Sequence, residues 1–247
     1  MPILGNEELE ANVIPGSNYG FSGTRIDTLG ATEFTLVAVA ADTSGSVYSF
    51  SDGIENCIRE IVVACQRSPR CDNLMLRMTQ FNSSLDEMHG FKPLQECNTD
   101  DYKDSIQCGG STALYDAADN AVRSVSSYGR QLMSNDYDVN GIVVVITDGC
   151  DNASAMTTAS VKKALTEAVQ GENLESIVSI LVGVNINDSY VSGNLADFSA
   201  KAGFTQYVEL GDANEKTLAK LADFVSRSIS AQSQALGTGG PSQSLTF

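Results

Sequence analysis

The sequence predicts an α/β fold: a doubly wound, mostly parallel six-stranded sheet with helices on both faces and one short antiparallel edge strand. Two observations support this prediction. Several short segments are almost continuously apolar, which is typical of parallel strands covered on both faces. These segments alternate with segments of helical periodicity, an order that produces parallel strands joined by helical crossovers.

Six segments are expected to form the strands. These segments are six to eleven residues long and are bounded by polar or glycine-containing stretches, as strands usually are. One of them, residues 84–94, is more polar than the others, so it is the expected antiparallel edge strand. In chain order the expected strands are residues 34–41, 74–81, 84–94, 141–147, 176–184 and 205–210.

The helical segments lie between these strands. The clearest has apolar residues spaced three and four apart, which places them on a single face. These residues are Ile54, Cys57, Ile58, Ile61, Val62 and Cys65. A second stripe covers residues 114–132, weaker patterns cover 158–170 and 195–201, and a last helix is expected from 215 to about 229.

A chain of 247 residues lies near the upper end of a single domain. We expect one α/β domain over residues 33–232. Residues 1–32 are glycine-rich and weakly patterned, so they are expected to form an extension with a hairpin. Residues 233–247 include the string GTGGPSQSLTF and are expected to be a flexible tail.

The charge of the chain is strongly unbalanced. It has 15 Lys and Arg against 31 Asp and Glu, a formal net charge of −16 with a pI near 4.3. Such a field repels phosphate backbones and anionic lipid, so we expect no nucleic-acid partner and no membrane partner. The apolar runs are too short to span a bilayer, and no basic residue precedes Arg25, which argues against a signal peptide. The expected location is cytoplasmic.

Six cysteines and a single histidine limit the available metal and disulfide chemistry. The cysteines form no C-x-x-C pair, so we expect reduced thiols, with Cys57 and Cys65 packed as small apolar side chains. His89 is expected at the surface, beside the edge strand. A zinc site is not expected, because one histidine and this cysteine spacing do not supply its ligands.

Side chains rich in oxygen follow two of the apolar strands and open one helix. Ligands of such sheets bind beyond the carboxyl ends of the strands, so these side chains are expected to converge. Alternate residues of an extended D-x-S-x-S loop point the same way. Two carboxylates with neutral hydroxyls suit Mg²⁺ or Mn²⁺, with Ca²⁺ also open, and leave the cation able to capture an anionic group. The candidate ligands are Asp42, Ser44, Ser46, Thr112 and Asp148.

These segments resemble the metal-ion-dependent adhesion site (MIDAS) of the von Willebrand factor type A family. The matching strings are D-T-S-G-S after a strand, G-G-S-T-A-L-Y-D-A at a helix start and V-I-T-D-G-C-D-N-A-S at a later strand end. All three occur in the family's order, and the alternation over residues 33–232 matches its Rossmann-like fold. The resemblance implies that Asp42, Ser44 and Ser46 ligate the ion. It implies the same of Thr112 and Asp148, directly or through water.

The resemblance also implies a role. Members of the family bind a protein partner that offers an Asp or Glu carboxylate to the cation. Short intracellular members without a signal peptide come mainly from bacteria, archaea and their viruses, and many act as adaptors or scaffolds. The expected function is therefore a metal-dependent protein-interaction module and not an enzyme.

Other interpretations of the same residues stay open. Asp42, Ser44 and Ser46 also suit a polar turn between strand and helix, and Thr112 suits a helix N-terminus. A metal-dependent phosphatase or other hydrolase is an alternative, although Ser44 stands where such an enzyme needs a second carboxylate as general acid. A structural subunit that self-associates through the same site is another alternative.

Two further acidic residues near these motifs are expected to have structural roles. Asp151 is expected to cap the helix that follows it, although a place near the metal ligands is also open. Asp116 lies in the first turn of its helix, where a carboxylate pairs with the helix dipole.

Overall fold

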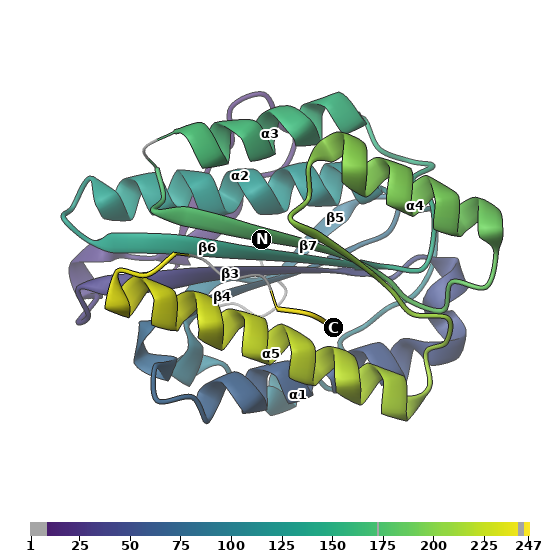
Figure 1. Ribbon diagram of the computed structural model, residues 1–247, viewed down its shortest axis with the longest axis horizontal. Coiled ribbons are helices and arrows are strands. Elements are labelled where there is room, and N and C mark those ends of the chain that lie inside the picture. The colour runs from purple at the N-terminus through teal and green to yellow at the C-terminus, as the bar shows by residue number, and fades with distance from the viewer. Residues whose placement is uncertain (1–8, 172, 242–244) are drawn as a thin grey trace.

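The computed structural model describes residues 9–171, 173–241 and 245–247 and has a layered α/β architecture (Figure 1). Within these residues eight strands form one sheet in the order β1-β2-β5-β4-β3-β6-β7-β8. The strands are β1 (Leu9–Asn12), β2 (Phe21–Thr24), β3 (Glu33–Asp42), β4 (Leu74–Phe81), β5 (Leu85–Pro93), β6 (Asp138–Thr147), β7 (Ser176–Gly183) and β8 (Gln206–Glu209).

The centre of the sheet is parallel, as the apolar strands predict. Strands β4, β3, β6, β7 and β8 are parallel neighbours, and β3 runs beside β6 from Glu33 opposite Asp138 to Ala41 opposite Ile146. Almost every residue of β3 and β6 is buried. Because these strands run in the same direction, the loops after β3, β6 and β7 all leave from one edge of the sheet, which we call the carboxyl edge.

The sheet is wider than the six strands that the sequence predicts. Strands β1 and β2 form an antiparallel hairpin within the predicted extension, and β2 joins β5 through the pair Gly23 and Phe91. Strand β5 is antiparallel to β4, as predicted, but it is not an edge strand. The two additional strands have four residues each, too few for a strand pattern to stand out from a polar loop.

Five α-helices in the described residues cover the two faces of the sheet. Helices α1 (Ser51–Gln66) and α5 (Glu215–Thr238) lie on one face, and α2 (Leu114–Met133), α3 (Thr158–Gln170) and α4 (Ser189–Ala202) lie on the other (Figure 1). Each was predicted from its periodicity. The buried apolar residues form two clusters, one under each helical layer. No described helix is both long and apolar enough to cross a membrane.

Helix α5 continues beyond its predicted end at residue 229 into the segment predicted to be a flexible tail. Gln232 and Ser233 are fully buried, and the Gln232 carbonyl accepts a hydrogen bond from Asn140 Nδ2 at 2.7 Å. Phe247 packs edge-on against Phe224, with ring centroids 5.4 Å apart. The last turns of α5 bury polar side chains, so the apolar periodicity that predicts the helix ends before the helix does.

The expectation that His89 lies at the surface is wrong. It is fully buried in β5, with Nδ1 2.9 Å from the Gly90 carbonyl oxygen and Nε2 2.7 Å from the Tyr102 hydroxyl. Because a carbonyl only accepts, Nδ1 carries the proton and Nε2 accepts from Tyr102. Burial, and to a smaller extent the positive charge of Lys92, lower the pKa of His89 to about 3. The imidazole is therefore neutral at pH 7.

Candidate metal centre

Asp42 is the last residue of β3, and its carboxylate joins β3 to the neighbouring strand β6. Its Oδ1 accepts the backbone N–H of Ser44 at 2.8 Å, and its Oδ2 accepts the hydroxyl of Thr147 at 2.6 Å. The first bond closes an Asx-type turn directly after the strand. Only 2% of the residue is exposed. The carboxylate is therefore held in one orientation at the carboxyl edge.

Hydroxyl groups connect the loop after β3 to the loop after β6. The hydroxyl oxygens of Ser44 and Ser46 lie 3.2 Å apart, and Ser46 Oγ donates to Asp148 Oδ1 at 2.8 Å. Ser44 is buried, Asp148 is half-buried, and Ser46 is exposed. The structure therefore brings four of the five predicted ligands into one hydrogen-bonded group that opens to solvent at Ser46.

The segment that contains Thr112 is fixed to both loops by its backbone. On one side, Gly109 N–H donates to the Thr43 carbonyl at 2.9 Å, and Gly45 N–H donates to the Gly110 carbonyl at 3.2 Å. On the other side, Asn152 N–H donates to the Thr112 carbonyl at 2.9 Å. Thr112 is 5% exposed, and among the described residues its hydroxyl forms no hydrogen bond. The structure places Thr112 between the two loops without linking its hydroxyl to the other four side chains.

The loop after β6 is clamped by the first turn of α2. The Asp116 carboxylate, 6% exposed, accepts the backbone N–H groups of Ala155 at 3.2 Å and Met156 at 2.7 Å. Asp151 Oδ1 accepts the N–H of Tyr115 at 3.2 Å. The prediction that Asp151 caps the following helix is therefore wrong: it caps the start of α2, and α3 is capped by Thr157. Asp116 is more than a partner of the helix dipole, since it also fixes this loop.

The two carboxylates at the carboxyl edge lack compensating positive charge. Burial raises the pKa of Asp42 to about 6 despite the hydrogen bonds from Thr147 and Ser44, and burial also raises the pKa of Asp148. In the described part of the chain neither carboxylate forms an ion pair with Lys, Arg or His. Desolvated carboxylates of this kind are stabilised by a cation.

The donor set fits a divalent cation that prefers oxygen. Two carboxylates and neighbouring hydroxyls are hard donors, and Mg²⁺, Mn²⁺ and Ca²⁺ favour such donors over imidazole or thiolate. Across residues 9–171, 173–241 and 245–247, no three His, Cys, Asp or Glu side chains form a group able to hold a metal. Binding of a cation at this position therefore requires the serine and threonine hydroxyls in addition to the two carboxylates. Ligation of a metal by the five residues stays a prediction.

Sequence reasoning missed Thr147. Its hydroxyl donates to Asp42, accepts Gly149 N–H at 3.2 Å, and so joins the two loops. A threonine at the end of an apolar strand carries no signal of its own. Its role follows only from the pairing of β3 with β6.

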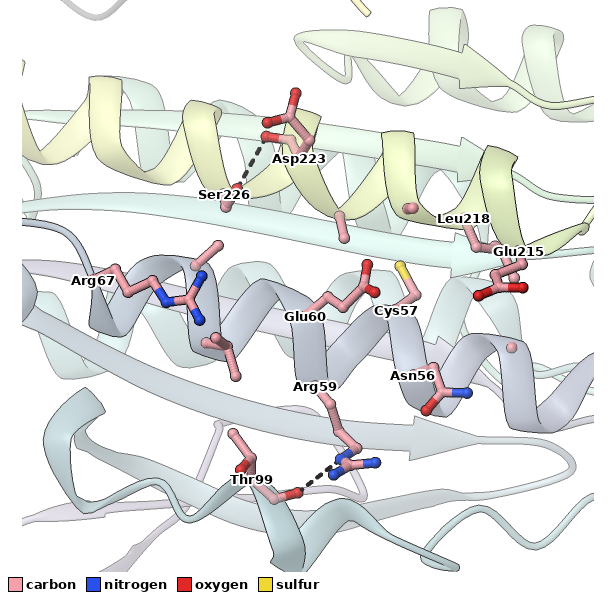
Figure 2. Close-up of a pocket in the computed structure, with 15 residues that line it drawn as sticks. Asn56, Cys57, Arg59, Glu60, Arg67, Thr99, Glu215, Leu218, Asp223 and Ser226 are labelled. Carbon is pink, nitrogen blue, oxygen red and sulfur yellow. Dashed lines mark hydrogen bonds between the residues drawn. The ribbon is translucent and has the colours of Figure 1, made fainter.

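A groove elsewhere on the molecule is separate from this site. It lies between α1 and α5 and has a volume of about 830 Å³. Figure 2 shows side chains of both charge signs around it, among them Glu60, Arg67 and Asp223. Two of the lining residues, Arg59 and Thr99, lie on the side of α1 away from α5, where Arg59 Nε donates to the Thr99 carbonyl at 3.2 Å (Figure 2). None of the five predicted ligands lines the groove.

No family model and no curated protein sequence matches the chain. Solved structures do. The PilB minor pilin of Streptococcus sanguinis superposes with a TM-score of 0.59 at 15% identity, covering 88% of this chain and 66% of the pilin. The pilus adhesin SpaC of Lactobacillus rhamnosus GG gives a TM-score of 0.57 at 10% identity, over 91% of this chain and 33% of the adhesin.

A third structure carries a named metal motif. It is proximal thread matrix protein 1 of the mussel byssus, solved with a zinc-occupied MIDAS motif, with a TM-score of 0.54 at 18% identity. The chain has a von Willebrand factor type A-like fold. The comparison covers 82% of this chain and 47% of the mussel protein. Because this chain spans less than two thirds of each of these proteins at low identity, the comparisons establish the fold and no shared activity.

Proposed function

We propose that this chain is a protein-interaction module that holds a divalent cation at the carboxyl edge and uses it to bind a carboxylate of a partner protein. The observation that carries the proposal is the hydrogen-bonded group of Asp42, Ser44, Ser46 and Asp148, which has no cationic partner among the described residues. The zinc-occupied MIDAS of the mussel protein, on a similar fold, supports a divalent ion in general.

The residues have separate roles in this proposal. Asp42, Ser44, Ser46, Thr112 and Asp148 hold the cation, which supplies Lewis acidity toward an anionic oxygen. Because three of these donors are neutral hydroxyls, much of the positive charge remains available for an Asp or Glu carboxylate from the partner. Mg²⁺ is the proposed ion, with Mn²⁺ and Ca²⁺ as alternatives.

The proposal describes binding without turnover. The only histidine is buried and neutral, and Ser44 occupies the position where a second carboxylate would act as general acid. A non-enzymatic adaptor role in the cytoplasm, without nucleic-acid or membrane partners, remains part of the proposal.

The test compares partner capture with and without the metal. Immobilised chain is incubated with extract of its native host in Mg²⁺ or in EDTA, and retained proteins are identified by mass spectrometry. Ser44→Ala is the variant, and Ser49→Ala, an exposed serine in the same loop, is the matched control. We expect a partner retained by wild type and Ser49→Ala in Mg²⁺ only. Equal retention of every partner in EDTA contradicts the proposal.

A further inference from the structure

Two exposed aromatic side chains lie at the carboxyl edge. Tyr48 is 78% exposed in the 3-10 helix η2 (Gly45–Phe50), two residues after Ser46. Tyr190 is 73% exposed in the first turn of α4. Exposed tyrosines of this kind offer a large apolar ring and a polar tip at low entropic cost, and tyrosine is enriched among the residues that dominate protein interfaces.

The two tyrosines flank the candidate metal site. Strand β6, which is followed directly by Asp148, lies between β3 and β7 in the sheet. Tyr48 follows β3 and Tyr190 follows β7. The loop that leads to Tyr190 starts beside the site, because Val184 N–H donates to the Thr147 carbonyl at 2.8 Å. The two tyrosines therefore follow the strands on either side of β6, at the edge of the sheet where a carboxylate would meet the site.

The loops around the candidate metal site carry negative charge, which favours a basic partner. Residues 43–53, 105–115, 148–157 and 184–194 contain no Lys or Arg. Exposed carboxylates lie in or beside these loops at Asp52, Asp188, Glu209 and Asp212. An acidic partner surface would be repelled here, whereas a basic one is complementary.

We infer that Tyr48 and Tyr190 anchor the partner, and that the partner is a protein segment rich in Lys and Arg that presents a single Asp or Glu to the cation. This inference rests on the proposed function for the bridging carboxylate. The evidence for the two tyrosine anchors and for the basic character of the partner does not depend on a bound metal.

The composition of the partner is tested by selection from a displayed library of random 16-residue peptides against the full chain in 5 mM Mg²⁺. We expect enriched peptides to combine one Asp or Glu with several flanking Lys or Arg. Enrichment of acidic or uncharged peptides, or no enrichment over the unselected library, overturns the inference.

The anchors are tested with the most enriched peptide, labelled with fluorescein and measured by anisotropy. Tyr48→Ala and Tyr190→Ala are each expected to weaken binding about ten-fold or more, and Tyr48→Phe to retain it. The control is Val169→Ala, which truncates another exposed apolar side chain, 70% exposed near the end of α3, and is expected to leave binding unchanged. Binding within two-fold of wild type in both tyrosine variants overturns the anchoring role.

The same peptide separates the two proposals. If EDTA and replacement of its acidic residue by amide both abolish binding while the tyrosine variants bind normally, the metal bridge stands and the anchors fail. If EDTA has no effect but the tyrosine variants lose binding, the anchors stand and the metal bridge fails.

Discussion

Replacing Asp42 by asparagine is expected to stabilise the metal-free protein at neutral pH. The carboxylate is 2% exposed, and no ion pair compensates its charge among the described residues. Asparagine keeps the shape and the oxygen that accepts Ser44 N–H, and its amide nitrogen can donate to the Thr147 hydroxyl, which rotates to accept. The substitution therefore removes a buried charge without removing its hydrogen bonds.

The size of the effect follows from the raised pKa of Asp42. Because the folded state binds the proton more tightly than the unfolded state, the stability of wild type falls as pH rises from about 4 to about 6. Moving this pKa from 3.8 to about 6 corresponds to roughly 3 kcal/mol once the group is ionised. About 2 kcal/mol of that loss falls between pH 4.5 and pH 7.5.

The assay is urea unfolding of wild type and Asp42→Asn in EDTA at both pH values. Comparing the two proteins cancels the titration of His89, which they share and which lies apart from Asp42. We expect the stability advantage of Asp42→Asn to grow by about 2 kcal/mol between pH 4.5 and pH 7.5. Added Mg²⁺ should stabilise wild type and not the variant. An advantage that stays constant with pH, or shrinks, would refute the reasoning.

Three other substitutions test the surrounding structure. The pKa of His89 is depressed to about 3 in the folded state, so wild type should lose about 2–3 kcal/mol of unfolding free energy between pH 7 and pH 4.5. His89→Gln should remove this loss. A pH dependence that is unchanged in urea titrations contradicts the prediction. Asp116→Ala should weaken Mn²⁺ binding about ten-fold by freeing the loop after β6, and unaltered affinity in calorimetry argues against a positioning role. Glu87→Ala should destabilise the protein by about 3–5 kcal/mol, because Glu87 accepts Arg77 Nε at 2.6 Å and the Ser22 hydroxyl at 2.8 Å. In this variant limited proteolysis should cut the β1–β2 hairpin first. A hairpin that resists the protease contradicts the conclusion that Glu87 holds it to the sheet through Ser22.

Periodicity was sufficient to predict the central layers of the fold. Strands β3, β6 and β7 are buried on both faces and are therefore continuously apolar in sequence. Helix α1 is buried on one face and therefore has a single apolar stripe. A hairpin was expected within residues 1–32, but the four-residue strands β1 and β2 show no such pattern to mark their positions or their addition to the sheet. The hairpin is held by Phe21, which packs edge-on against Phe91 and Tyr128 in the core, and by polar contacts. Among these contacts, Glu87 binds Ser22, and the Tyr128 hydroxyl donates to the Thr24 carbonyl at 2.6 Å.

The candidate site was predictable to the extent that its residues follow strands directly. Asp42 and Asp148 lie where parallel neighbouring strands end, so their proximity follows from strand order alone. Contacts that depend on the path of a loop could not be predicted. The clamp by Asp116 and the bond of Asp151 to the start of α2 both require that the loop after β6 fold back onto α2.

Binding of Mn²⁺ to the purified chain, followed by the loss of the free-ion signal in electron paramagnetic resonance, tests the central claim most directly. The measurement needs no partner and no knowledge of one. We expect one ion bound per chain, displaced by Mg²⁺ and lost in Asp42→Ala, with Ser49→Ala unchanged. A wild-type chain that binds no Mn²⁺ at millimolar concentration, or an Asp42→Ala variant that binds it as tightly, would contradict the account.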